Sequence, residues 1–197
     1  MSLIAFIRHG RTLWNEAGRI QGHTDTELSP RGRSEVEHWR LPVRFHTWQC
    51  FCSPLRRTRD TAILLGAVDP TPAAELIEMD WGQWEGKTLQ ELRAELGENM
   101  VLNESLGLDF RPHGGESPRD VRDRLKQWIA GLKIAGVLPA IAVCHKGVIR
   151  SALSLATGWT MEDKWPVKLR DDCAQLFRVV EGNLEVEQLN IPLNPEP

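Results

Sequence analysis

The chain has 197 residues, a formal net charge of −3 and 41% hydrophobic residues, which suits one large α/β domain with a substantial core. A mildly acidic chain is a poor general binder of nucleic acid and other polyanions, so any anion site must be local. Because the sequence has no leader pattern and no apolar run long enough to span a bilayer, we expect a cytoplasmic protein with no membrane segment.

The four cysteines favour buried thiols in a reducing compartment. Cys144 and two others, Cys50 and Cys52, lie near or within short apolar runs, and Cys173 lies near the C-terminus. The Cys50-x-Cys52 spacing is not that of a redox pair, and no matching second pair completes a zinc site. We therefore expect no metal and no other cofactor.

The first predicted element is a strand from Leu3 to Ile7, five apolar residues without alternation. Such runs are typical of strands buried on both faces of a sheet. Arg8, His9 and Gly10 follow at its carboxyl end, where open α/β sheets bind ligands. An arginine fork matches phosphate geometry, and a neutral imidazole can attack phosphorus. The alternative is a strand that simply ends in polar residues at solvent.

The polar stretch from Trp14 to Leu28, punctuated by glycine, is predicted to be a loop. Three helices then begin with the same signal, a serine N-cap with proline in the first turn. These starts are Ser29-Pro30, Ser53-Pro54 and Ser117-Pro118, and Gly66 and Gly136 are placed to close the second and third helices.

Two further buried strands are predicted at Gln49 to Cys52 and Ala140 to Cys144. The segments 175–180 and 184–189 flank a hairpin signal at Glu181-Gly182-Asn183. Strands that alternate with helices predict an α/β fold, a three-layer αβα sandwich with a mostly parallel central sheet. The C-terminal hairpin is expected to add an antiparallel edge to that sheet.

We expect the whole chain, 1–197, to form one domain. The segment 86–115, with a helix near 89–96 followed by an irregular stretch, is expected to cover one end of the sheet as a partial lid. Residues 191–197 contain three prolines and are expected to form an extended tail.

Three of the buried strands end in charged or catalytic residue types. Arg8-His9 follows the first, Ser53 through Arg57 the second, and His145-Lys146 the third. If these strands lie side by side, two imidazoles and at least two guanidinium groups converge on one small volume. Like charges do not gather without a counter-ion, so this arrangement predicts a bound dianion such as a phosphoryl group.

A further stretch, Glu78 to Gly86, places carboxylates among tryptophans. A carboxyl group shielded from water by tryptophan favours its protonated form, as a general acid requires. The alternative reading makes Glu78 a surface residue and the tryptophans core, and for the tryptophans we favour the core.

Six motifs, in the same order along residues 4 to about 150, resemble the histidine phosphatase superfamily. They are Arg8-His9-Gly10-x-Thr12 with Asn15, Gln21-Gly22-x-x-Asp25, Ser53-Pro54-Leu55-x-Arg57 with Thr61-Ala62, Glu78-x-x-x-Gly82-x-Trp84-Glu85-Gly86, Gly114-Gly115-Glu116-Ser117 and His145-x-Gly147. The branch resembled is the phosphoglycerate mutase-like one, which includes cofactor-dependent mutases and small phosphatases such as α-ribazole phosphatase. Together the six motifs are highly specific for this superfamily, although no single motif would be.

The resemblance implies a role for each matching residue. His9 would be the nucleophile that becomes phosphohistidine, while Arg8 and Arg57 grip the phosphoryl oxygens. His145 would complete the pocket, and Asn15 would donate a further hydrogen bond. No metal is required.

The resemblance also places Gln21 and Gly22 in the phosphate-binding loop. Glu78 would protonate the leaving oxygen and then accept a proton from the attacking water. Arg57 matches the family spacing from Ser53, whereas its neighbour Arg56 is expected at the surface.

Imidazole titrates near pH ~6.5, so we expect one histidine to be neutral for attack and the other charged for binding. Arg11 replaces the glutamate common in the family, which would make the mouth of the pocket more positive. Mutases typically carry serine or threonine at Gln21, Gly-Asn at Lys146-Gly147 and an insertion with paired arginines. These departures favour hydrolysis, since a mutase must exclude water from its intermediate.

The sequence therefore predicts a phosphatase that hydrolyses a small phosphorylated metabolite through a phosphohistidine. The alternatives are a cofactor-dependent phosphoglycerate mutase and a catalytically silent phosphate-binding domain. The silent alternative loses weight because His9, Arg8, Arg57, Glu78 and His145 are all present. The natural ester and the oligomeric state stay open, a homodimer included. From their positions, Met79, Trp81, Arg111 and His113 are candidates to line the site from the lid side.

Overall fold

The computed structural model describes residues 2–165 and 167–193. Its strands form one sheet in the order β3-β2-β4-β1-β5-β6. They are β1 (Leu3–Arg8), β2 (Gln49–Cys52), β3 (Thr71–Pro72), β4 (Ala140–Cys144), β5 (Cys173–Val180) and β6 (Asn183–Pro192). The pairs from β3 to β1 are parallel, whereas β5 and β6 are antiparallel. The predicted mostly parallel sheet with an antiparallel C-terminal hairpin is confirmed.

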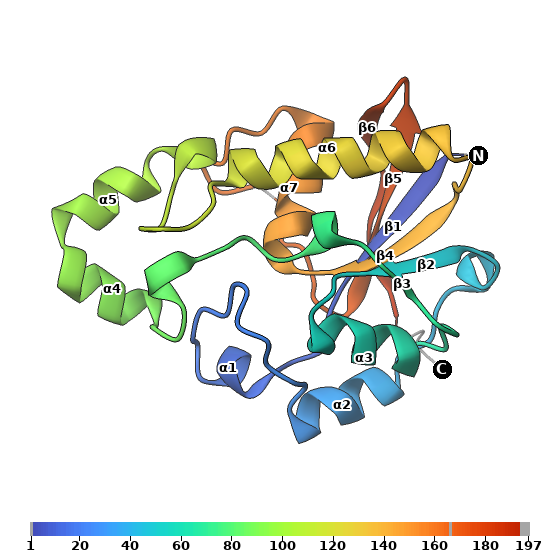
Figure 1. The fold of residues 1–197 in the computed structure, drawn as a ribbon, viewed down its shortest axis with the longest axis horizontal. Coiled ribbons are helices and arrows are strands. Elements are labelled where there is room, and N and C mark those ends of the chain that lie inside the picture. The colour runs from blue at the N-terminus through green and yellow to red at the C-terminus, as the bar shows by residue number, and fades with distance from the viewer. Residues whose placement is uncertain (1, 166, 194–197) are drawn as a thin grey trace.

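Helices cover both faces of this sheet (Figure 1). The helices are α1 (Leu13–Glu16), α2 (Pro30–Glu37), α3 (Arg56–Leu64), α4 (Leu89–Leu96), α5 (Glu98–Glu104), α6 (Pro118–Ile134) and α7 (Lys146–Thr157). α2 and α3 pack against one face, and α6 and α7 against the other. The result is the expected three-layer sandwich.

The sheet has a hydrophobic core on each face, which explains why apolar and polar residues do not alternate along the first strand. Ile4 and Phe6 of β1 pack into the core beneath α6 and α7. Ala5 and Ile7 pack into the core beneath α2 and α3. All four side chains are fully buried, because helices take both faces of a central parallel strand away from water.

Two of the three predicted helix starts are confirmed. The Ser29 side chain accepts a hydrogen bond from the Gly32 backbone N–H at the start of α2. The Ser117 side chain likewise accepts from the Asp120 N–H, which forms a capping box on α6. Gly66 and Gly136, both with positive φ, follow the ends of α3 and α6.

The predicted start at Ser53-Pro54 is wrong. α3 begins at Arg56, and its N-cap residue, Leu55, makes no side-chain cap. The Ser53 hydroxyl instead lies 2.9 Å from Nε2 of His145, a residue 92 positions away. A local capping signal cannot reveal that a buried hydroxyl has a tertiary partner.

The segment 86–115 extends away from the sheet on the left of Figure 1 as α4 and α5. Its Leu92 and Met100 form a small separate core with Trp84, which precedes the segment. No helix in the described ranges has the length and apolar character needed to cross a membrane.

The segment expected as an extended tail starts inside the sheet. Ile191 and Pro192 end β6, and the buried Leu193 donates its N–H to the Asp172 carbonyl at 3.0 Å. The remaining tail positions, 194–197, lie outside the described residues.

Candidate active site

The strands whose polar endings were predicted to converge are neighbours, in the order β2-β4-β1. The His9 N–H donates to the Cys144 carbonyl at 3.0 Å, and the Ser53 N–H donates to the Val143 carbonyl at 3.1 Å. These hydrogen bonds extend the parallel pairing one residue beyond the carboxyl ends of β1 and β2. As a consequence the rings of His9 and His145 lie edge to face with their centroids 5.0 Å apart.

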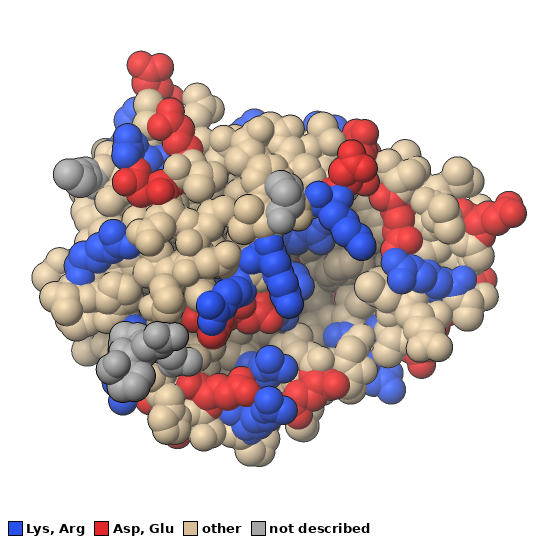
Figure 2. All heavy atoms as spheres, turned by 180° about the vertical axis from the view of Figure 1, so that it is seen from behind, with Lys and Arg blue, Asp and Glu red and all other residues tan. Residues whose placement is uncertain are grey.

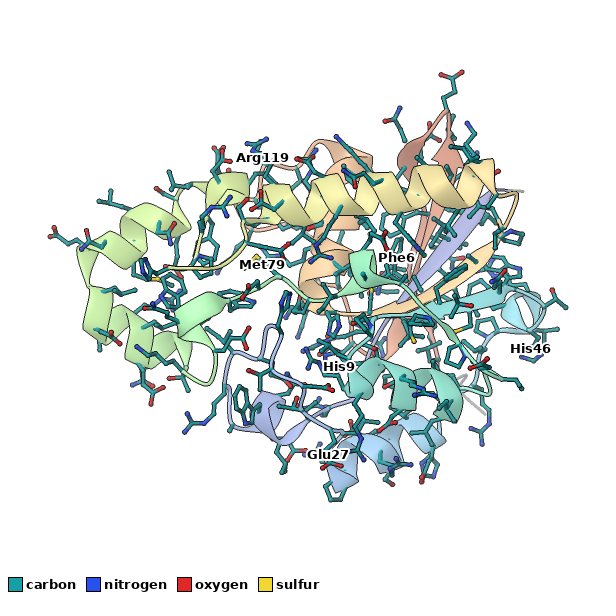
Figure 3. The ribbon with its side chains drawn as sticks, in the orientation of Figure 1. Phe6, His9, Glu27, His46, Met79 and Arg119 are labelled. Atoms are coloured by element: carbon teal, nitrogen blue, oxygen red, sulfur yellow. The ribbon has the colours of Figure 1, made fainter. Side chains whose placement is uncertain are left out.

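His9 follows the carboxyl end of β1 (Figure 3), and one hydrogen bond fixes its tautomer. Its Nδ1 is 2.7 Å from the Gly10 carbonyl oxygen. A carbonyl only accepts, so Nδ1 carries the proton and Nε2 keeps its lone pair. Burial lowers the pKa of His9 well below its usual value, and the charges of Arg8 and Arg57 lower it further. The imidazole is therefore neutral and nucleophilic.

His145 is fully buried behind His9. Its Nε2 contacts the Ser53 hydroxyl, whereas its Nδ1 has no hydrogen-bond partner among the described residues. Burial lowers the pKa of His145 well below its usual value, and the charges of Arg57 and Arg8 add to the effect. The expectation of one neutral and one charged histidine is therefore wrong for this structure. The same desolvation and the same cations act on both rings.

Arg57 is a fully buried cation at the start of α3. Its Nη1 donates to the Thr24 carbonyl and its Nη2 to the Gly22 carbonyl, each at 2.8 Å. Its Nε has no partner among the described residues. Burial lowers the pKa of this guanidinium, and the Glu78 carboxylate opposes that shift.

Arg56, its neighbour, lies at the surface. Its guanidinium pairs with Glu27 at 3.3 Å and with Asp60 at 3.7 Å. The two arginines are thus separated as their spacing from Ser53 predicts, one in the interior and one exposed.

Glu85 holds the loop that grips Arg57. Its Oε1 accepts from the His23 N–H at 2.7 Å, and its Oε2 accepts from the Thr24 N–H at 2.8 Å. Gly22 has a φ of +55°, and a Cβ there would lie 1.9 Å from Oε1 of Glu85. The loop therefore needs glycine at this position. The sequence contained Glu85 in a motif but gave no indication of this contact.

Arg8 pairs with a residue that sequence reasoning missed. Its Nη1 lies 2.5 Å from Oδ2 of Asp171, 163 positions along the chain, and no local pattern signals that pairing. The Nε of Arg8 is buried without a partner among the described residues. Arg11 is half exposed and pairs with Glu35 of α2 at 3.2 Å.

Asn15 and Gln21 have their side-chain oxygens occupied. Oδ1 of Asn15 accepts from the Thr12 N–H at 3.2 Å, and Oε1 of Gln21 accepts from the Thr12 hydroxyl at 2.7 Å. Each amide therefore retains its NH₂ group as a donor. The Gly22 carbonyl accepts from Arg57, and its backbone N–H is the group that can donate to an anion.

Glu78 is held against the N-terminus of α7. Its carboxylate accepts from the Met79 N–H at 2.9 Å and from the Gly147 N–H at 3.3 Å. A Cβ at Gly147 would lie 2.3 Å from Oε1 of Glu78, so the carboxylate occupies space that only glycine leaves free. The His23 ring, with Nε2 2.9 Å from the Glu78 carbonyl, supports the same segment.

A cavity of about 450 Å³ joins these groups, and Arg8, His9, Arg57 and Glu78 all lie on its wall. This volume suits a small metabolite. Asn15, Gln21 and Gly22 also line it, as do Leu89, Glu104, Gly107 and Phe110 from the segment 86–115. His145 is not among the lining residues, although its ring centroid lies 5.0 Å from that of His9.

Of the four residues expected to line the site from the lid side, two line the cavity and two do not. Met79 and Trp81 line the cavity, and Figure 3 shows Met79 on the segment above His9. Arg111 and His113 do not line it. Arg111 instead pairs with Asp120 near the start of α6, at 2.6 Å.

Three unsatisfied polar atoms belong to side chains that line the cavity or pack against His9. In the described part of the chain five buried side-chain polar atoms lack a partner, and three of them are Nε of Arg8, Nε of Arg57 and Nδ1 of His145. Native proteins leave few such atoms, and each calls for a partner. An oxyanion supplies acceptors for all three. Within the same ranges no group of three or more metal-ligating side chains is placed to hold a metal ion.

Comparison with known proteins gives consistent similarities. The model of the histidine phosphatase superfamily (branch 1) matches residues 4–192. A glucosyl-3-phosphoglycerate phosphatase from Mycolicibacterium vanbaalenii is 32% identical over 177 residues, covering 83% of this chain and 77% of the relative. Phosphoserine phosphatase 1 from Hydrogenobacter thermophilus is 30% identical over 198 residues, covering 97% and 93%.

Solved structures agree with the sequence similarities. The α-ribazole phosphatase from Shigella flexneri superposes with a TM-score of 0.80 at 25% identity, covering 95% of this chain and 96% of that one. Phosphoglycerate mutases are also among the relatives. Small-molecule phosphatases and mutases thus both occur at about this level of identity.

The buried neutral histidines predict how stability depends on pH. Since the pKa of His9 is lowered in the folded state, below pH ~6.5 the unfolded state binds more protons, and the free energy of unfolding falls as the pH falls. His9 contributes up to about 1.4 kcal/mol per pH unit to that slope. In urea unfolding between pH 7.5 and 5.5, His9→Asn should have a smaller slope than the native chain.

The exposed His46 provides the matched control, and His46→Asn should keep the native slope. Equal slopes for His9→Asn and the native chain would contradict a neutral, desolvated His9.

Proposed function

The chain belongs to branch 1 of the histidine phosphatase superfamily, and from this premise we propose that it is a phosphomonoesterase. It hydrolyses a small phosphorylated metabolite through a phosphohistidine on His9. The observation that carries the proposal is the set of unsatisfied buried atoms of Arg8, Arg57 and His145 around an imidazole whose Nε2 lone pair is free.

In the first step, Nε2 of His9 attacks phosphorus and the bond from phosphorus to the ester oxygen breaks. Arg8, Arg57 and His145 hold the equatorial oxygens, with the amide groups of Asn15 and Gln21 as further donors. Phosphoryl transfer requires little covalent chemistry from a protein, so the rate comes from placement and fixed positive charge. Contacts within the protein already restrain several of these groups, which supports a pre-arranged set of donors.

Glu78 would transfer the protons. As the ester bond breaks, its carboxyl group gives a proton to the leaving oxygen. The resulting carboxylate then takes a proton from water as the water oxygen attacks phosphorus and the bond to Nε2 breaks. The products are the alcohol and inorganic phosphate, and His9 returns to its neutral form. The contact between Glu78 and the Gly147 N–H places the carboxylate beside the strand end that carries His145.

Hydrolysis is favoured over phosphoryl exchange by three departures from the mutase pattern. Gln21 stands where mutases typically have serine or threonine, and Lys146-Gly147 where they have Gly-Asn. The segment 86–115, which we propose as a partial lid, lacks a pair of adjacent arginines. A phosphoglycerate mutase is the second candidate, because mutases are among the relatives.

The first test measures inorganic phosphate released from a panel of phosphorylated metabolites. We expect phosphate release by the native chain, and for His9→Ala the loss of both turnover and acid-labile labelling by substrate phosphate. Isomerised phosphoglycerate with no release would establish the mutase instead. Phosphate binding without either reaction would favour a silent domain.

The role of Glu78 is tested by the leaving group. Glu78→Gln should slow esters of poorly acidic alcohols by about 10²- to 10⁴-fold, and an ester of an acidic phenol far less, because a phenolate leaves without a proton. The comparison uses kcat values for alkyl and nitrophenyl phosphates. Equal losses for both classes would remove Glu78 from the acid role.

Arg57 and Arg56 form a matched pair of variants. Arg57→Ala should lower kcat/KM by about 10²- to 10³-fold, since it removes a fixed donor from a water-poor site. Arg56→Ala removes only exposed ion pairs, which contribute little, and should stay within about threefold of the native value. The reverse ranking would contradict the assignment of Arg57.

A further inference from the structure

A second hollow, of about 1200 Å³, adjoins the catalytic cavity. We call it the side groove. The two spaces share the residues of their common wall, which are Arg8, His9, Asn15, Lys146 and Arg150. The side groove therefore adjoins the place where the phosphoryl group would react, and the same side chains border both spaces.

The side groove is strongly cationic. Seven Lys and Arg side chains and three carboxylates line it, although the whole chain carries a net charge of −3. Figure 2 shows Lys and Arg side chains gathered around a hollow on this face of the molecule. A local excess of one charge in a cleft attracts ligands of the opposite charge.

The carboxylates of the side groove do not neutralise this excess. All three are engaged in ion pairs, which are Asp171–Arg8, Asp172–Arg170 and Glu35–Arg11. In the ranges that the structure describes, no ion pair is formed by the remaining cations of the groove, which are Lys146, Arg150, Lys164 and Lys168.

Two of these cations stand on the wall shared with the catalytic cavity. Lys146 and Arg150 lie one turn apart on α7, a spacing at which like charges destabilise a helix. Burial lowers the pKa of Lys146, and the charges of Arg8, Arg150 and Lys168 contribute to that shift. The cations are thus close enough to repel one another.

Arg150 is also held in place by a contact other than an ion pair. Its guanidinium lies over the Trp159 ring, 5.2 Å from the ring centroid. Stacking of this kind fixes the side chain while leaving its N–H groups available. The arrangement resembles that of Arg57, whose outer nitrogens are fixed while Nε is left open.

The remaining two unsatisfied buried atoms belong to the same region. They are Oγ of Ser151, beside Arg150 on α7, and Nε1 of Trp165. Ser151 lines the catalytic cavity and Trp165 lines the side groove. Both atoms can donate a hydrogen bond, so the region offers donors as well as charge.

We propose that the substrate carries a second anionic group, a carboxylate or another phosphate, which Lys146 and Arg150 bind while the scissile phosphoryl group lies at His9. This inference rests on the proposed phosphatase function and names its substrate class, small phosphate monoesters with a second negative charge a few bonds from the ester. Simple alkyl and aryl phosphates lack that group and use only the catalytic cavity.

The test compares matched esters by kcat/KM. 3-Phosphoglycerate and glycerol 3-phosphate differ by a carboxylate, and fructose 1,6-bisphosphate and fructose 6-phosphate differ by a second phosphate. A charge-assisted hydrogen bond corresponds to a factor of about 10 to 100, so the native chain should prefer the more anionic member of at least one pair by tenfold or more. The pair that shows the preference identifies the group as carboxylate or phosphate.

In the double variant Lys146→Gln/Arg150→Gln that ratio should fall toward one. Lys126→Gln, an exposed site on α6 that lines neither space, should keep the native ratio. Native ratios near one, or a ratio unchanged in the double variant, would overturn the inference while leaving a phosphatase. Failure of every ester to release phosphate would instead overturn the proposed function on which the inference rests.

Discussion

The site depends on one buried cation, the guanidinium of Arg57. Removing a charge from water is costly unless the charge is paired and hydrogen-bonded. Here two backbone carbonyls of the loop 22–24 accept from its outer nitrogens, and Glu85 fixes that loop from behind. The carboxylates of Glu78, Asp25 and Glu85 help to keep the guanidinium charged. These contacts leave Nε without a partner among the described residues and one N–H free of them on each outer nitrogen, and in our proposal these donors bind the phosphoryl group.

Burial is the main cause of the neutral state of both histidines, and this cation adds to it. A positive charge fixed beside two desolvated imidazoles disfavours a further proton on either, so the pKa values of both are lowered. His9 then differs from His145 through hydrogen bonding rather than through charge. The Gly10 carbonyl holds the proton of His9 on Nδ1, whereas Ser53 occupies Nε2 of His145. In our proposal these donors are arranged before the phosphoryl group binds, which is the condition under which electrostatic stabilisation is strongest.

The start of α7 connects the catalytic cavity with the side groove. His145 immediately precedes the helix, Gly147 makes room for Glu78, and Lys146 and Arg150 face both spaces. In our proposal the first turns of one helix therefore contribute to phosphoryl binding, proton transfer and recognition of the rest of the substrate. Such concentration of function at the carboxyl ends of parallel strands is general in α/β proteins.

The sequence by itself predicted the three-layer fold and, if three strands were neighbours, the convergence of their polar endings, and the family resemblance favoured Arg57 over Arg56. These conclusions rest on apolar runs and motif spacing, which are local properties of the chain. Only the tertiary structure decided the partners: Asp171 for Arg8, Glu85 for the loop under Arg57, and Ser53 for His145. Each of those contacts joins residues more than 60 positions apart. It likewise decided the neutral state of both histidines, because desolvation depends on how the whole chain packs around a group and not on the residues beside it in sequence.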